Sequence, residues 1–196
     1  MAEQKTLLTI EGIDESIYAG FWTRLGSLLL DLLIMLPYGL LILYINGLSR
    51  NTFYFTLIPS LLFQFWFSIY LVRKYGGTPG KLLVGIRILK LNGTALTWRE
   101  AILRGSISFV FTIFLSVLTL YALSVADGKH YESLGWMKKQ QYLFAFTPLM
   151  FLVYSWVSCI WAYSELFVLL LNKRKRAIHD YIAGTVIVKS KYINKI

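Results

Sequence analysis

The sequence predicts an all-α membrane protein with four transmembrane helices and a small cytoplasmic β-hairpin element. Of its 196 residues, 57% are hydrophobic and 15% are charged, whereas soluble domains are about 45–50% apolar and about 25% charged. The hydrophobic residues also gather in runs of about 20, the length that crosses about 30 Å of hydrocarbon as a helix. This composition excludes disorder, a disulfide scaffold and an ordinary basic nucleic-acid binder.

The chain divides into a short tail at each end and one membrane domain. Residues 1–17 carry four acidic residues and one lysine, which is unlike the basic start and apolar middle of a secretory signal. The membrane domain occupies residues 18–190, and residues 191–196 form the C-terminal tail. The expected helices cover about residues 19–45, 51–72, 105–126 and 142–171.

Orientation follows from the lysines and arginines of the connecting segments. Residues 73–104 and 172–196 hold seven each, whereas residues 46–52 hold one and residues 127–141 hold three. Segments rich in these residues stay on the cytoplasmic side of a membrane. Four crossings place both rich segments there, so we expect the loop 73–104 and both termini in the cytoplasm.

The cytoplasmic loop contains a strand pattern. Val84, Ile86 and Ile88 alternate with other residues, and Asn92-Gly93 then gives a strong hairpin signal before residues 94–98. We expect a β-hairpin at the membrane surface. Thr185–Lys189 is a second β-branched run, and pairing it with the hairpin edge would attach the C-terminus beneath the helices.

Charges within the first apolar run are the main functional signal. At about 100° per residue, one face of that helix collects its small and polar side chains. They are Gly20, Arg24, Ser27, Asp31 and Tyr38. A charge at mid-helix costs about 2.5–3.5 kcal/mol on insertion scales, and such residues face the bundle interior and mark a pathway or a site.

The last helix repeats this design with Tyr154, Ser158, Trp161 and Glu165 at spacings of three and four. Two polar faces in a bundle are expected to face each other. We therefore predict an ion or proton site formed by Asp31, Arg24 and Glu165.

Structural interpretations of the same residues stay open. Arg24 near a helix end can reach lipid phosphates, and Asp31 can be neutralised by Arg24 or another cation as a structural pair. A face of glycine and serine is also what close helix packing uses.

Three motifs, in order, resemble the RDD family of bacterial multi-pass membrane proteins. They are Ala19–Arg24 (AGFWTR) with Leu30-Asp31, Gly77–Lys81 (GTPGK) with Gly85–Ile88, and Ala177–Asp180 (AIHD) with Ala183–Val188. The family is named for one Arg and two Asp, which here would be Arg24, Asp31 and Asp180. The resemblance implies a bacterial cytoplasmic membrane location and a presumed transport role, with monovalent cation/proton antiport assigned to some members.

The basic residues beside the membrane are expected to contact anionic lipid headgroups, where each contributes about 1 kcal/mol. In the GTPGK motif, Thr78 would cap and Pro79 would start a short turn that carries Lys81 to the headgroups. The full expected set is Lys81, Arg87, Lys173, Arg174, Lys175 and Arg176. Asp180 would pair with a neighbouring cation, and an interior partner such as Arg24 would join it to the network.

Two functions compete. The first is transport of small monovalent cations, Na⁺ or K⁺, coupled to protons through an intramembrane carboxylate, by a homo-oligomer. The second is a scaffold or accessory subunit that docks a partner membrane protein or anionic lipid. We expect no enzyme, cofactor or metal centre, because the sequence has no catalytic or metal-ligand spacing and because the adjacent His179 and Asp180 would not face each other on a helix.

Overall fold

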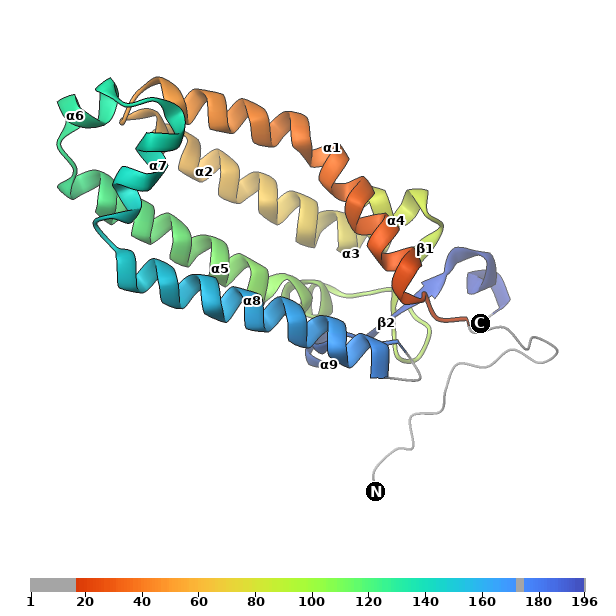
Figure 1. Ribbon diagram of the computed structural model, residues 1–196. Helices are drawn as coiled ribbons and strands as arrows, with labels where there is room; N and C mark the ends of the chain where they lie inside the picture. Colours follow the sequence, from red (N-terminus) through yellow and green to blue (C-terminus); the bar gives the residue numbers. More distant parts are fainter. Residues whose placement is uncertain (1–16, 172–174, 196) are drawn as a thin grey trace. The chain divides into compact units, whose positions relative to one another are not determined.

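The computed structural model describes residues 17–171 and 175–195, and this part of the chain is mostly helical (Figure 1). It forms two compact units. Among the described residues, the first unit comprises 17–35, 65–107, 163–171 and 175–195, and the second comprises 36–64 and 108–162.

Within the described residues, four stretches are long and apolar enough to cross a membrane. They are Phe21–Leu48, Thr52–Leu83, Trp98–Val125 and Pro148–Leu171. Three are single helices, α1 (Phe21–Leu48), α5 (Trp98–Val125) and α8 (Pro148–Leu171). The other is interrupted, as α2 (Thr52–Phe65), a π-helical turn (Trp66–Tyr70), α3 (Leu71–Tyr75) and α4 (Pro79–Leu83).

Several helix boundaries differ from those expected: α5 starts at Trp98 rather than at residue 105, and α1 ends at Leu48 rather than at residue 45. Two further differences have a local cause. Helix α8 starts at Pro148 rather than near residue 142, because a proline at the first helical position needs no backbone donor there. Helix α3 ends at Gly76, whose φ of 77° is the left-handed conformation that closes helices. The chain then turns into α4, with Thr78 at the N-cap position and Pro79 at the first helical position, as the sequence predicted, but the Thr78 side chain makes no capping hydrogen bond, because its hydroxyl donates to Asp31.

Strands β1 (Ile86–Lys90) and β2 (Thr185–Lys189) form an antiparallel pair, with Ile86 opposite Lys189 and Lys90 opposite Thr185. The predicted pairing of the C-terminal strand is therefore confirmed. On its other edge β2 contacts the segment before α1, since the amide of Ala19 donates to the carbonyl of Ile187 at 2.9 Å. Helix α9 (Ile178–Ala183) precedes β2, and a 3-10 helix (Ser190–Lys195) follows it.

The predicted hairpin through residues 94–98 is wrong. Asn92-Gly93 does turn the chain, with Gly93 at φ 81° and its amide bonded to the carbonyl of Lys90 at 3.0 Å. However, Thr97 then starts α5, because its amide donates to the Glu100 carboxylate at 2.7 Å in the arrangement of a helix capping box. The edge of β1 is left for β2.

The two strands separate two apolar clusters, because successive side chains of a strand point to opposite faces. One cluster is Ala19, Ile69, Val72, Ile86, Ile88, Leu96, Ala101 and Ile187. The other is Ile17, Tyr18, Leu89, Val186, Val188 and Tyr192. The small sheet is thus the core around which the first unit packs.

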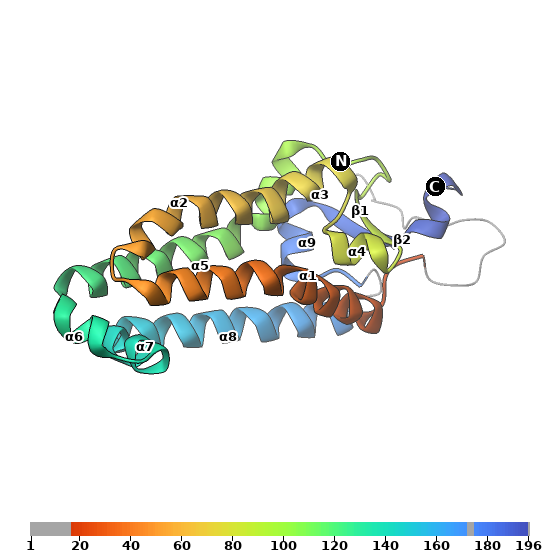
Figure 2. The same cartoon turned by 90° about the horizontal axis from the view of Figure 1, so that it is seen from above.

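In the second unit, the segment after α5 folds into two short helices, α6 (Gly128–Ser133) and α7 (Trp136–Phe144) (Figure 2). Two cations there cap helix ends. The Lys139 ammonium donates to the carbonyl of Gly47 in the last turn of α1 at 2.7 Å, and the Arg50 guanidinium donates to the carbonyl of Ala126 after α5 at 3.0 Å. Such caps satisfy carbonyls that a helix end leaves unpaired.

We predict that Lys139→Met destabilises the protein by about 1.5–3 kcal/mol, the value of a hydrogen bond to a charged group. Lys139 is 5% exposed, and its ammonium also lies 5.1 Å from the ring centroid of Tyr131. Methionine keeps the apolar stem and removes the donor. Unfolding in detergent micelles, followed by circular dichroism, measures the loss.

The neighbouring Lys138 is exposed and provides the matched control. Lys138→Met is expected to change the unfolding free energy by less than about 0.5 kcal/mol, the usual range for surface substitutions. Equal effects of the two variants would contradict the capping role of Lys139.

Candidate functional site

A buried ion triad joins three helices of the first unit. The Asp180 carboxylate of α9 is fully buried, and its Oδ2 lies 2.8 Å from Nη1 of Arg24 on α1. Its Oδ1 is bonded to Nη1 of Arg104 on α5. The side chains of Arg24 and Arg104 are themselves only 10% and 8% exposed. One carboxylate therefore pairs with two guanidiniums that reach it from different helices.

The protein also holds Asp180 through hydrogen bonds near α9. The amide of Ala177 donates to its Oδ2 at 3.0 Å, which ties the carboxylate to the start of its own helix. Thr185 at the start of β2 accepts a hydrogen bond from Arg104 at 2.9 Å and donates to Asp180 at 3.4 Å. Each carboxylate oxygen thus has several donors, as a buried charge requires.

Burial by itself raises the pKa of Asp180, but the positive charge of Arg104 and Arg24, together with the hydrogen bond from Arg24, outweighs it and holds that pKa well below its usual range. Asp180 is therefore an anion at neutral pH.

A carboxylate–imidazole pair extends the triad. Glu165 of α8 accepts the backbone amide of His179 on Oε1 at 2.8 Å, and its Oε2 lies 2.5 Å from Nδ1 of the imidazole. Nε2 of the same ring is 2.8 Å from Nη2 of Arg104. Because guanidinium only donates, Nε2 must accept there, and the ring proton is then on Nδ1, facing Glu165.

We call these five side chains the charged network: Glu165, His179, Arg104, Asp180 and Arg24. Each side chain contacts the next in that order, from α8 to α9, then to α5, back to α9 and on to α1. The expectation that His179 and Asp180 do not face each other is wrong. Nε2 of His179 lies 3.6 Å from Oδ1 of Asp180, because Arg104 binds both.

Asp31 lies in a second arrangement, which we call the Asp31 clasp: Asp31, Thr78, Gly80 and Lys81. Its Oδ2 accepts the Thr78 hydroxyl at 2.5 Å and the Lys81 ammonium at 3.4 Å. Its Oδ1 accepts the amide of Gly80 at 2.7 Å. The GTPGK motif therefore wraps around a single carboxylate of α1.

Gly80 allows this close approach. A Cβ at residue 80 would lie 2.6 Å from the amide nitrogen of Asp31 and 2.8 Å from its Cγ, and it would collide with the carbonyl of Ser27. No side chain fits between α4 and α1, which explains a glycine within a helical turn.

The structure divides the residues that the sequence assigned to one site. Arg24 binds Asp180 rather than Asp31, and Glu165 binds His179. Arg24 and Glu165 therefore belong to the charged network, whereas Asp31 lies in the Asp31 clasp. Sequence reasoning missed Arg104 and His179, although an arginine at the start of an apolar run, like Arg24, is a signal for an interior partner.

The basic residues that were expected at lipid headgroups have different surroundings in the structure. Lys81 turns inward to Asp31 instead of reaching headgroups. Arg176 is 7% exposed and donates to the carbonyls of Asp180 and Thr185 at 2.8 and 3.0 Å, because the start of β2 folds over it. Arg87 on β1 is exposed. Lys175 donates to the carbonyl of Leu170 at 3.2 Å, and Lys173 and Arg174 lie outside the described residues.

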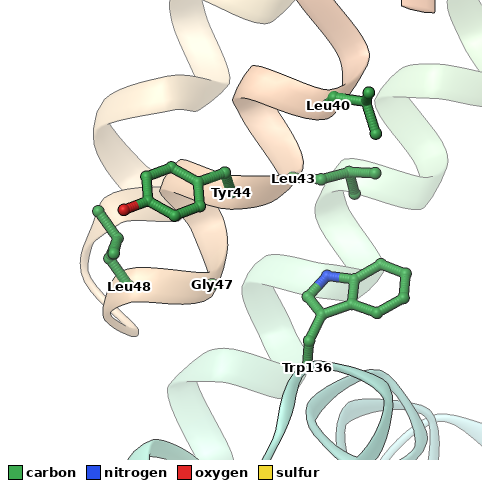
Figure 3. A pocket seen from close by; sticks show the side chains of 6 residues that line it. All are labelled: Leu40, Leu43, Tyr44, Gly47, Leu48 and Trp136. Carbon is green, nitrogen blue, oxygen red and sulfur yellow. The ribbon is translucent and has the colours of Figure 1, made fainter.

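The second unit contains a separate apolar pocket of about 440 Å³. Its lining residues are Leu40, Leu43, Tyr44, Gly47, Leu48 and Trp136 (Figure 3). The α1 residues recur at spacings of three and four, so they form one face of the helix. The indole of Trp136, at the start of α7, approaches that face (Figure 3). Among the described residues, no three His, Cys, Asp or Glu side chains group as metal ligands.

We predict that Asp180→Asn destabilises the protein by about 3–5 kcal/mol at neutral pH, because it leaves two buried guanidiniums without an anion. Since the folded-state pKa lies below the unfolded value of about 3.9, the stabilisation from Asp180 is complete above pH 4 and is lost as the pH falls below it. Melting temperatures in micelles between pH 3 and pH 7 measure both effects.

Asp127→Asn is the control, because Asp127 is an exposed helix cap and asparagine caps as well as aspartate. Its melting curve is expected to follow the wild type at every pH. A stable Asp180→Asn protein would show that the triad does not hold the unit together.

We also predict that Gly80→Ala lowers the unfolding free energy by about 1–3 kcal/mol, the cost of overpacking a tight contact. Gly26→Ala on α1 is the matched control, since a Cβ there meets nothing within 4 Å and alanine favours the helix. Thermal unfolding of the two variants in the same detergent gives the comparison, and equal stability would contradict the tight approach at Gly80.

Comparison with known proteins places these residues in a family. The protein named "Uncharacterized protein YckC" from Bacillus subtilis (strain 168) is 26% identical over 174 residues, which cover 86% of this chain and 83% of the relative. The model of the RDD family matches residues 18–184, a range that contains every member of the charged network and of the Asp31 clasp. The chain therefore belongs to the RDD family.

Proposed function

We propose that this protein exchanges small monovalent cations, Na⁺ or K⁺, for protons across the bacterial cytoplasmic membrane, with Asp31 as the exchange site. One observation carries the proposal: the carboxylate of Asp31, within the apolar helix α1, is neutralised by a single flexible ammonium, that of Lys81. An anion in an apolar helix must have a compensating charge. A mobile cation or a proton can supply it in place of lysine.

The groups around Asp31 suit a hard cation. Its neighbour is the Thr78 hydroxyl, and oxygen ligands are those that small hard cations prefer. The Asp31 side chain is 14% exposed, so water has access to it. Arg24 was the expected tuning group, but it is bound to Asp180. In this proposal Lys81 takes that role.

Glu165 is proposed as the auxiliary proton acceptor. Its Oε2 lies 2.5 Å from Nδ1 of His179, a distance within hydrogen-bond reach for proton transfer. A proton arriving at this pair would be shared between carboxylate and imidazole. Arg24, Arg104 and Asp180 then serve as the fixed frame that orients the imidazole.

The membrane arrangement is part of the same proposal. Both termini are cytoplasmic, since the two segments that hold seven lysines and arginines each lie on one side. In this arrangement Arg87 and Lys175 contact anionic headgroups on that side. Because transporters commonly move two repeats or halves against each other, a chain with four helices is proposed to act as a homo-oligomer.

A scaffold or accessory subunit is the second candidate, and the apolar pocket at Trp136 favours it. The pocket lies on an exposed face of α1, with Leu40 and Leu48 at 56% and 60% exposure. A helix of a partner membrane protein could insert a side chain there. In that case the purified protein would carry no flux.

We predict that the purified protein moves protons across the membrane of liposomes that hold a pH gradient when Na⁺, K⁺ or Li⁺ is added to the external solution. We expect Asp31→Asn to reduce this proton flux to the level of empty liposomes. Asparagine keeps the shape of Asp31 and removes its charge and titration. A pH-sensitive dye inside the vesicles measures the flux.

Asp127→Asn, an exposed carboxylate of the second unit, is the matched control and should transport at the wild-type rate. Unchanged flux in Asp31→Asn would exclude this exchange site. Absence of flux in the wild type, together with one stoichiometric partner in a pull-down, would favour the scaffold.

A further inference from the structure

The ammonium of Lys81 lies at a position that two oxygens prepare for a cation. Its Nζ is 3.4 Å from Oδ2 of Asp31 and 3.0 Å from Oγ1 of Thr78. The hydroxyl proton of Thr78 is directed to Asp31, at an oxygen–oxygen distance of 2.5 Å. The lone pairs of that hydroxyl are therefore left for Nζ, so both oxygens present negative charge to the same point.

The two oxygens do not depend on Lys81 for their positions. Oδ1 of Asp31 is held by the amide of Gly80 at 2.7 Å, and the close packing of Gly80 on α1 fixes the distance between the two segments. Lys81, by contrast, reaches the position through a flexible four-carbon stem. Departure of the ammonium would leave the pair of oxygens in place.

The charge of the position favours a monovalent ion. Asp31 contributes one negative charge, and Lys81 neutralises it with one positive charge. A monovalent cation that replaces the ammonium preserves this balance. Arg24 and Arg104 also repel positive charge at the lysine position, which disfavours a divalent ion. Side chains of Lys81 and Asp31 are 21% and 14% exposed, so water can complete the coordination shell.

We propose that Oδ2 of Asp31 and Oγ1 of Thr78 form a binding site for Na⁺ or Li⁺, and that Lys81 is the built-in competitor that occupies it. This inference rests on the proposed function. It adds the two oxygens that bind the ion and the lysine that competes with it. Lys81 then sets the affinity for the transported ion, because the ion must displace its ammonium from both oxygens.

Equilibrium binding of ²²Na⁺ to the purified full-length protein, with no gradient present, tests the site. Lys81→Met is expected to bind Na⁺ at least about fivefold more tightly than the wild type, since removal of a partly exposed ion pair frees the carboxylate. Asp31→Asn and the double variant Lys81→Met/Asp31→Asn should bind none, and Thr78→Val in the Lys81→Met background should weaken binding about tenfold. Mg²⁺ should not compete.

Two further lysine variants make the result specific. Lys90→Met removes a lysine from the separate pair with Glu100, whose Nζ–Oε2 distance is 3.6 Å, and should bind Na⁺ as the wild type does. Lys81→Arg keeps a competing cation and should bind no more tightly than the wild type, which tests the inference even if Lys81→Met does not fold. Tighter binding by Lys81→Arg, or unchanged binding by a folded Lys81→Met, would overturn the proposal.

The result of this binding experiment can be distinguished from the result of the transport assay. Na⁺ binding that needs Asp31 and Thr78 and is relieved by Lys81→Met supports the site even where liposomes show no proton flux. Conversely, flux that depends on Asp31 while Lys81→Met leaves Na⁺ affinity unchanged supports exchange and rejects Lys81 as the competitor.

Discussion

The first unit depends on the burial of one carboxylate, Asp180, between two guanidiniums. Removal of an ion from water costs several kcal/mol even after relaxation, so neither arginine can be buried without the anion, nor the anion without them. Arg24 and Arg104 come from α1 and α5, and Asp180 comes from the short helix α9 before β2. The C-terminal strand therefore reaches its place in the sheet beside the two long helices as part of one electrostatic arrangement.

The Asp31 clasp solves a similar problem with different chemistry. Asp180 is neutralised by arginines, which stay charged and bind in a fixed fork, and it has no exposed surface. Asp31 is bound by a hydroxyl, a backbone amide and a lysine, and it keeps partial contact with solvent. The contacts of Asp180 suit an ion pair that stays formed, whereas the contacts of Asp31 suit a carboxylate that exchanges one cation for another. This difference leads us to assign the framework to Asp180 and the ion chemistry to Asp31.

The sequence predicted what depends on local pattern. The long apolar runs, the C-terminal strand and the turn at Asn92-Gly93 were each readable from composition, alternation or turn chemistry. The hairpin was wrong because the hairpin signal was given more weight than the capping box of Thr97 and Glu100, a helix-start signal at the same place. The pair of Arg24 and Asp180 was expected from the family motifs and is present. Other distant partners could not be derived, since nothing local shows that Arg104 binds Asp180 or that Lys81 turns back to α1.

Lys81 shows why it is difficult to predict whether a lysine or arginine side chain points into the protein or toward the lipid. In a sequence with 20 lysines and arginines against 10 acidic residues, each cation near the membrane is expected at the headgroups. Lys81, Arg176 and Lys139 instead lie against carboxylates or helix carbonyls inside the protein. In an apolar helix every anion and every unpaired carbonyl needs a cation or donor nearby. Part of the excess of positive charge therefore serves the interior of the protein.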